Sequence, residues 1–114
     1  MANTKTIKKN EQFSLFNVEL TIKSISGDAH LTTSSIYLND NLIKNGEGFV
    51  EVHTTAQSGN ELFISATINM PAGSSDLASL SIEMNDDHNF KRWDYSSPEP
   101  DYDEVIYEVT ITLT

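Results

Sequence analysis

Residues 104–113 read EVIYEVTITL, and this stretch decides the fold class. Large apolar side chains occupy every second position from Val105 to Leu113, and mostly polar side chains stand between them. A period of two is typical of a β-strand with one buried face, because successive side chains of a strand point to opposite sides. The stretch therefore predicts a strand that supplies part of a buried core.

Alternation of the same kind runs through three earlier segments and, more weakly, through two others. The clear segments span residues 16–23, 62–68 and 78–84, and the weaker ones span 31–38 and 48–55. Turn signals rich in Gly, Asn, Asp, Ser and Pro separate them, at residues 26–28, 39–41, 45–46, 58–60 and 71–73. Turns spaced about 8–12 residues apart are typical of antiparallel sandwiches and barrels. We therefore predict an all-β fold, in which the helix-compatible residues 74–80 form a turn that enters a strand.

The length and composition narrow the class of protein. The 114 residues suit a single domain, 1–114, and the lack of Cys excludes disulfides, zinc–thiolate sites, iron–sulfur clusters and thiol catalysis. No apolar run approaches the ~18 residues of a membrane-spanning helix, so we expect no membrane insertion. The opening MANTKTIKKN carries three Lys with no apolar region after them. We therefore expect no signal peptide and cytoplasmic synthesis, with release to act outside the cell left open.

The charge balance is strongly acidic, with 7 basic and 17 acidic residues and a net charge of −10. Such a surface repels phosphate groups, so we expect neither nucleic acid nor an anionic membrane as a partner. Nine of the acidic residues lie between Glu83 and Glu108, where only Lys91 and Arg92 offset them. A region of this kind attracts cations.

Within the acidic region, residues 94–104 read DYSSPEPDYDE and hold five carboxylates and no basic side chain. Two carboxylates about 4 Å apart repel by ~4 kcal/mol at an effective dielectric constant near ~20. Calcium relieves this repulsion, since it takes ~6–8 oxygen ligands in irregular geometry. Pro98 and Pro100 stiffen the segment. The predicted calcium ligands are Asp94, Glu99, Asp101, Asp103 and Glu104, and a solvated acidic turn is the alternative.

No pattern of catalytic residues stands out elsewhere. The three histidines, His30, His53 and His88, lack the spacing of metal ligands, and there is no G-x-S-x-G motif. The adjacent acids Asp86 and Asp87 could serve acid–base chemistry, but neighbouring acids on a turn are usually solvated. We therefore expect that the protein is not an enzyme.

The C-terminal third of the chain has three features that are similar to those of a known family. They are the run SDLASLSIEMNDDHNF at residues 75–90, the sequence DYDE at 101–104 that ends the acidic loop, and one strand that runs to the last residue. In these features the chain resembles the bacterial two-calcium fucose- and mannose-binding lectins, whose acidic loop ends in D-x-D-Y-N-D. A weaker likeness covers residues 16–27 and 36–41. The resemblance implies an antiparallel β-sandwich of about nine strands in which sugar hydroxyls bind calcium.

The resemblance also implies which residues hold the metal: Asp94, Glu99, Asp101, Asp103, Glu104 and Thr114. Glu99 and Asp101 match the family's D-x-D carboxylates, while Asp103 and Glu104 match the Asn and Asp that follow. Thr114 replaces a C-terminal glycine whose carboxylate, in the family, reaches the partner subunit's site. The added charge at Asp103, and the lack of a clear match for a further family Asn, leave open whether two, one or no calcium ions bind.

The loop at residues 23–27 is expected to line the rim of the site and to set which sugar is preferred. The sugar-binding residues implied by the resemblance are Ser24, Ser26, Gly27, Glu99 and Asp101. Lys23 could instead place an ammonium beside the acidic loop and substitute for one calcium ion. The family arrangement implies a homodimer or higher homo-oligomer. We therefore expect a calcium-dependent lectin for fucose- or mannose-like sugars; the alternative is a non-enzymatic β-sandwich interaction or assembly protein whose acidic loop is structural or solvated.

Overall fold

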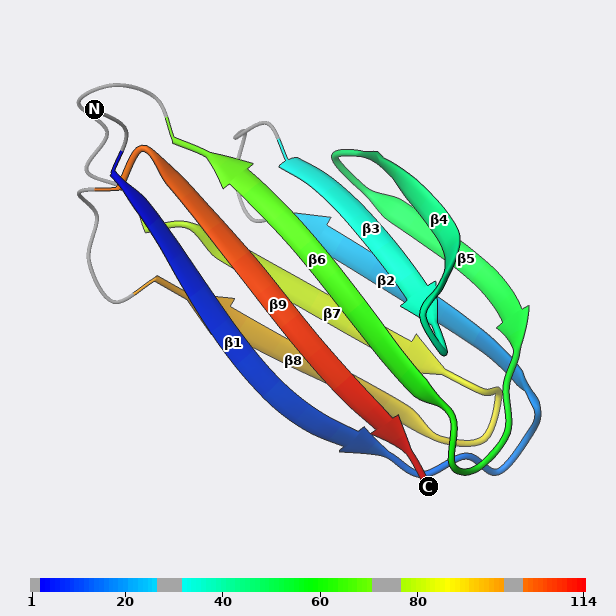
Figure 1. Cartoon of the computed structure of the whole chain (residues 1–114). Helices are drawn as coiled ribbons and strands as arrows, with labels where there is room; N and C mark the ends of the chain where they lie inside the picture. Colours follow the sequence, from blue (N-terminus) through cyan, green and yellow to red (C-terminus); the bar gives the residue numbers. More distant parts are fainter. Residues whose placement is uncertain (1–2, 27–31, 71–76, 98–101) are drawn as a thin grey trace.

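The computed structural model describes residues 3–26, 32–70, 77–97 and 102–114, which form two packed β-sheets (Figure 1). One sheet has the strand order β1-β9-β6-β3-β4 and the other has the order β5-β2-β7-β8. The strands within these ranges are β1 (Thr4–Phe13), β2 (Glu19–Ser26), β3 (Thr32–Leu38), β4 (Asn41–Glu47), β5 (Val50–Thr55), β6 (Glu61–Asn69), β7 (Ser79–Asn85), β8 (Phe90–Ser96) and β9 (Glu104–Leu113). The predicted all-β sandwich of about nine strands is confirmed.

The core lies between the sheets and is built by the alternating segments. In β9, the alternate residues Val105, Tyr107, Val109, Ile111 and Leu113 are buried, and the residues between them, Ile106 and three polar ones, face outward. The same holds for β6 and β7, whose buried residues are Leu62, Ile64, Ala66, Ile68, Leu80, Ile82 and Met84. Tyr107 is the largest fully buried side chain, and its hydroxyl donates to the carbonyl of Ala78 at 2.7 Å. Burial raises the pKa of Tyr107 to about 12.

In the part of the chain that the structure describes, the strand pairs are antiparallel with one exception at the edge of the larger sheet. There β1 runs parallel to β9, which brings the first and last strands of the chain side by side (Figure 1). The pairing puts Lys5, Lys9 and Glu11 opposite inward-facing residues of β9, so the inner row of this edge strand carries charges. Inward-pointing charges on an edge strand discourage pairing with a further chain.

Two boundaries differ from the sequence prediction. The strand predicted to begin at Phe16 begins instead at Glu19, and the side chains of Phe16 and Val18 are 65% and 58% exposed. The predicted turn at Asn45 and Gly46 is wrong, because both residues pair with β3 inside strand β4. The chain turns at Gly48 instead, whose positive φ of 69° favours glycine.

The other turn signals have mixed outcomes. Asn39 and Asp40 connect β3 to β4 with positive φ angles of 48° and 67°, which suit a tight hairpin. The signal at residues 58–60 also forms a turn, around Gly59. The signals at residues 27–28 and 71–73 lie outside the described residues, as do residues 74–76 of the helix-compatible stretch. No helix in the described ranges is long and apolar enough to cross a membrane.

Candidate functional site

The two segments that the sequence assigns to a sugar site leave the sandwich at the same end. In the smaller sheet, the end of β2 pairs with the start of β7, and Ser79 at that start pairs with Ser96 at the end of β8. In the larger sheet, Asn69 at the end of β6 pairs with Glu104 at the start of β9. We call this end, marked by Ser26, Asn69, Ser79, Ser96 and Glu104, the loop end (Figure 1). The segment after β2 and the acidic segment before β9 both emerge here.

Two of the predicted metal ligands lie at the loop end among the described residues. Asp103 accepts a hydrogen bond from the backbone amide of Asn3 at 2.8 Å through Oδ2, and its own amide donates to the carbonyl of Asn3 at 2.9 Å. The carbonyl of Asp103 accepts from the amide of Met70 at 2.8 Å. Glu104 follows as the first residue of β9 and is half-buried. The backbone that carries these two carboxylates is therefore fixed on both sides.

Three predicted site residues, Gly27, Glu99 and Asp101, lie outside the described residues. Ser26 is the last residue of β2 and is thus at the loop end. Among the residues that the structure does describe, no group of three or more His, Asp and Glu side chains could hold a metal ion. The predicted calcium set therefore depends on Glu99 and Asp101.

Asp94 lies in strand β8 rather than in a loop, and its carboxylate is already engaged. Its Oδ1 accepts hydrogen bonds from the hydroxyl of Ser81 at 2.5 Å and from Nε of Arg92 at 2.9 Å. These bonds lower the pKa of Asp94, first through Ser81 and then through Arg92. Arg92 also contacts Glu83 at 3.2 Å. The structure thus places Asp94 in an exposed ion pair on the smaller sheet, whereas Glu104 belongs to the larger one.

Thr114 lies at the end of the molecule opposite the loop end (Figure 1). Its amide donates to the carbonyl of Phe13 and its main-chain oxygen accepts from the amide of Leu15, both at 2.9 Å. Ten residues of β9 separate it from the loop end, a distance of roughly 33 Å at the rise of a β-strand. Within one chain, Thr114 therefore cannot join the other predicted ligands, so its predicted role requires a second subunit.

The predictions for Ser24 and Lys23 are wrong. Ser24 has no exposed surface, and its hydroxyl is 3.0 Å from that of Ser34 in the space between the sheets. It therefore cannot line the rim of a site. Lys23 points to the outer face of the smaller sheet, where its Nζ is 3.8 Å from a carboxylate oxygen of Glu51. Because successive side chains of β2 point to opposite faces of the sheet, Ser24 faces the core and Lys23 faces the outer surface.

Asp86 is not a solvated turn acid, because its side chain is 1% exposed and anchors two segments of backbone. Its Oδ1 accepts from the amides of His88 and Asn89 at 3.0 and 2.6 Å, and its Oδ2 accepts from those of Phe16 and Asn17 at 2.6 and 3.1 Å. Burial alone would raise the pKa of this carboxyl, but the four backbone hydrogen bonds outweigh burial and lower the pKa to about 2. Asp86 is therefore a structural carboxylate rather than an acid–base group.

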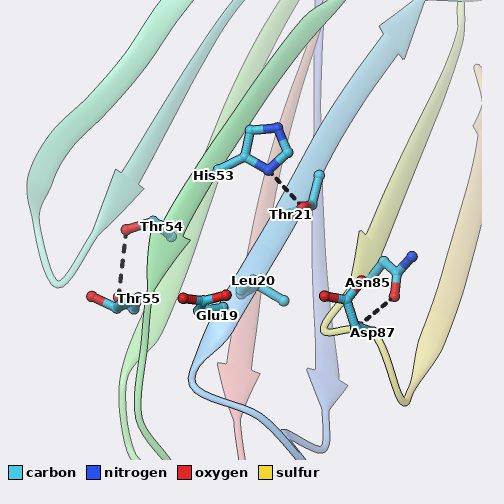
Figure 2. Close-up of a pocket in the computed structure, with 8 residues that line it drawn as sticks. All are labelled: Glu19, Leu20, Thr21, His53, Thr54, Thr55, Asn85 and Asp87. Atoms are coloured by element: carbon cyan, nitrogen blue, oxygen red, sulfur yellow. Dashed lines mark hydrogen bonds between the residues drawn. The ribbon is translucent and has the colours of Figure 1, made fainter.

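A groove that the sequence did not reveal crosses the outer face of the smaller sheet (Figure 2). We call it the outer groove; it has a volume of about 570 Å³ and is lined by Glu19, Leu20, Thr21, His53, Thr54, Thr55, Asn85 and Asp87. A smaller hollow of about 230 Å³ adjoins it, shares three of these residues and adds Lys23, Glu51, Glu83 and Phe90. The lining residues come from β2, β5, β7, the turn after β7 and the start of β8, so strand pairing brings them together.

The described residues therefore offer two places for binding chemistry. At the loop end lie Asp103 and Glu104, the last two residues of the acidic segment, and hydrogen bonds fix their backbone. The outer groove holds hydroxyl, amide, imidazole and carboxylate groups on three strands. No protein-family model, no curated protein and no solved structure gives a significant match to the chain.

Proposed function

We propose that this protein is a calcium-dependent lectin whose sugar site lies at the loop end. The observation that carries the proposal is that the end of β2 and the start of β9, distant in sequence, lie at one end of the sandwich. The segment that follows Ser26 and the acidic segment that precedes Glu104 emerge at one end of the sandwich. The resemblance to the two-calcium lectins requires this juxtaposition, because one segment supplies the metal ligands and the other lines the rim.

The chemistry of the acidic segment supports calcium as the cofactor. Apart from Asp94, which Arg92 holds in β8, the segment has four carboxylates with no basic side chain among them in the sequence, and repulsion between these carboxylates favours a bound cation. Neighbouring sugar hydroxyls can replace water on such an ion, since calcium accepts neutral oxygen ligands. A carboxylate beside the ion strengthens the contact by accepting a hydrogen bond from the same hydroxyl. Fucose- and mannose-like sugars, which carry neighbouring hydroxyls, are the proposed ligands.

The first test is thermal unfolding in calcium and in chelator. A ligand that binds only the folded state at a hundredfold excess over Kd adds about 2.7 kcal/mol, which should raise the melting temperature by ~10 °C. Asp101→Asn should abolish the shift, because this residue lies in the middle of the acidic segment. Asp40→Asn is the matched control, since Asp40 sits in the β3–β4 turn, where Asn tolerates the positive φ. Equal melting temperatures with and without calcium would contradict the metal and the lectin together.

The second test is a glycan array probed with calcium and with chelator. Binding of fucosides or mannosides that requires calcium would support the lectin. A calcium-induced rise in melting temperature with an array that stays blank would leave calcium as a structural ion and contradict sugar binding at the loop end.

One observation favours the alternative, an interaction or assembly protein without a metal. Asp94 is held by Arg92 and Ser81, so one of the predicted ligands already has its counter-charge within the protein. If the protein is such an interaction or assembly protein, calcium should change neither its melting temperature nor its binding of a partner. Neither reading assigns a catalytic residue.

A further inference from the structure

We infer that the outer groove is a second binding site, which takes an uncharged pyranose without calcium. Thr21, at the centre of the groove, is five residues along β2 from Ser26, which corresponds to about 17 Å. The outer groove is therefore separate from the loop end. The inference rests on the groove's own residues and does not depend on the proposed calcium site.

Several polar groups in the groove have no partner within the part of the chain that the structure describes. Neither the carboxylate of Glu19 nor that of Asp87 makes a hydrogen bond or ion pair in these ranges, and the same is true of the amide nitrogen of Asn85. Carboxylates only accept hydrogen bonds, whereas the amide nitrogen donates them. Sugar hydroxyls both donate and accept, so a ring that bears several hydroxyls can satisfy both kinds of group.

The hydroxyl of Thr21 is oriented by His53 at the centre of the groove (Figure 2). Nε2 of His53 is 2.9 Å from Oε2 of Glu51, and Nδ1 is 2.8 Å from Oγ1 of Thr21. In the neutral ring, the proton that Glu51 accepts is on Nε2, so Nδ1 accepts the proton of the Thr21 hydroxyl. The oxygen of Thr21 then remains free to accept a hydrogen bond from a ligand.

The end of the groove near Asp87 is held rigidly. Asp87 has a positive φ of 70°, and its amide donates to Oδ1 of Asn85 at 2.7 Å (Figure 2). The preceding residue, Asp86, is fixed by four backbone amides, as described above. The next residue, His88, stacks on Phe16 with ring centroids 3.7 Å apart. Polar groups positioned before a ligand arrives lose little entropy on binding it.

An exposed aromatic ring completes the site. Phe90 pairs with Asn85 across β7 and β8, lines the adjoining hollow and is 60% exposed. A pyranose presents a face of C–H groups that can cover such a ring, while its hydroxyls reach the polar groups beside it. The groove's 570 Å³ falls within the ~300–1,000 Å³ typical of small-molecule sites.

The charges in the groove decide which pyranoses fit. Glu19 and Asp87 are carboxylates without a counter-ion among the described residues, so a uronic acid meets repulsion there. No three His, Asp and Glu side chains in the described ranges are arranged to hold a metal ion. An uncharged sugar avoids this repulsion, and its hydroxyls can satisfy both the carboxylate acceptors and the amide donor of the groove.

The test is a titration of the ¹⁵N-labelled full chain followed by amide chemical shifts, in excess EDTA. The probes are the methyl pyranosides of mannose, glucose and galactose, with those of glucosamine and glucuronic acid as charged comparisons, each raised to tens of millimolar. We expect at least one of them to shift the amides of Thr21, His53 and Asn85 but not those of Ser79, Ser96 and Glu104 at the loop end. Because EDTA removes calcium, failure of the calcium-dependent lectin would not affect this result, and the reverse also holds.

Three exposed positions, Phe90, Asp87 and Phe49, provide the variants and their control. Phe90→Ala should weaken binding by about tenfold, whereas Phe49→Ala is the matched control, since Phe49 is 55% exposed and does not line the groove. Asp87→Asn should also weaken binding, because Asn keeps the positive φ but removes the charged acceptor. The inference is overturned if none of the three pyranosides shifts the groove amides, if Phe49→Ala weakens binding as much as Phe90→Ala, or if only the methyl glycoside of glucosamine or glucuronic acid binds.

Discussion

At the scale of single residues, Asp86 is a buried carboxylate whose role is set by the four backbone amides that donate hydrogen bonds to it. Each of its two carboxylate oxygens accepts two backbone amides, so the side chain joins the β7–β8 hairpin to the segment before β2. The same contacts explain why Phe16 is exposed despite its place in an alternating pattern. The amide of Phe16 is pinned to Asp86, and the strand begins only at Glu19.

Asp86→Asn should therefore destabilise the fold. The amide group of Asn presents N–H groups to two backbone donors that need an acceptor, and unsatisfied buried donors cost about 1–3 kcal/mol each. We expect a loss of about 2–4 kcal/mol in the free energy of unfolding, measured by urea denaturation. Asp87→Asn, on the adjacent exposed residue, should change it by less than about 0.5 kcal/mol. Equal stabilities of the two variants would contradict the role given to Asp86.

The pH dependence of stability tests the same residue. The pKa of Asp86 is lowered from 3.8 to about 2 in the folded state, so its contribution is complete above pH 4 and is lost as the pH falls from about 4 to about 2. The lost contribution amounts to about 2 kcal/mol. The gap in unfolding free energy between the wild type and Asp86→Asn should therefore narrow across this interval. A gap that stays constant from pH 6 to pH 2 would contradict the lowered pKa.

At the scale of elements, the strands that the sequence predicts are those with one buried face. Along β6, β7 and β9, every second side chain faces the core, and the sequence places apolar residues at these buried positions. β1, β4 and β8 were not predicted, since each lies at the edge of a sheet and is exposed over much of both faces. The outer groove escaped prediction for a related reason. Thr21, His53 and Asn85 are far apart in sequence and become neighbours only through strand register.

The edge strand β1 gives a prediction at this scale. Glu11 accepts a hydrogen bond from the hydroxyl of Tyr95 at 2.7 Å, and Nζ of Lys9 lies 6.0 Å from the centre of the same ring. Burial and the bond to Glu11 raise the pKa of Tyr95 above its usual value. The double replacement Lys5→Val and Lys9→Val removes two of the three inward charges of the edge, leaving Glu11, and should promote self-association. Light scattering should show this increase, whereas the control Lys23→Val, on the outer face of the central strand β2, should behave like the wild type.

At the scale of the whole molecule, the arrangement of the two ends limits how a sugar site can be completed. The loop end and Thr114 lie at opposite ends of β9, so a C-terminal contribution to the site requires another subunit. We therefore predict a homodimer or higher homo-oligomer if Thr114 takes part. Sedimentation of the full chain at micromolar concentrations should show it. A monomer would remove Thr114 from the proposed ligand set while leaving the carboxylates at Asp103 and Glu104 in place.

The proposed lectin function depends on calcium at the acidic segment of the loop end, and a structure of crystals grown in calcium would show whether the ion is there. We predict an anomalous difference peak beside Asp103 and Glu104, with carboxylate oxygens at about 2.3–2.6 Å from the ion and with Glu99 and Asp101 among its ligands. A well-ordered acidic segment with no peak, and with Asp94 still paired to Arg92, would contradict the calcium site and the lectin function that depends on it.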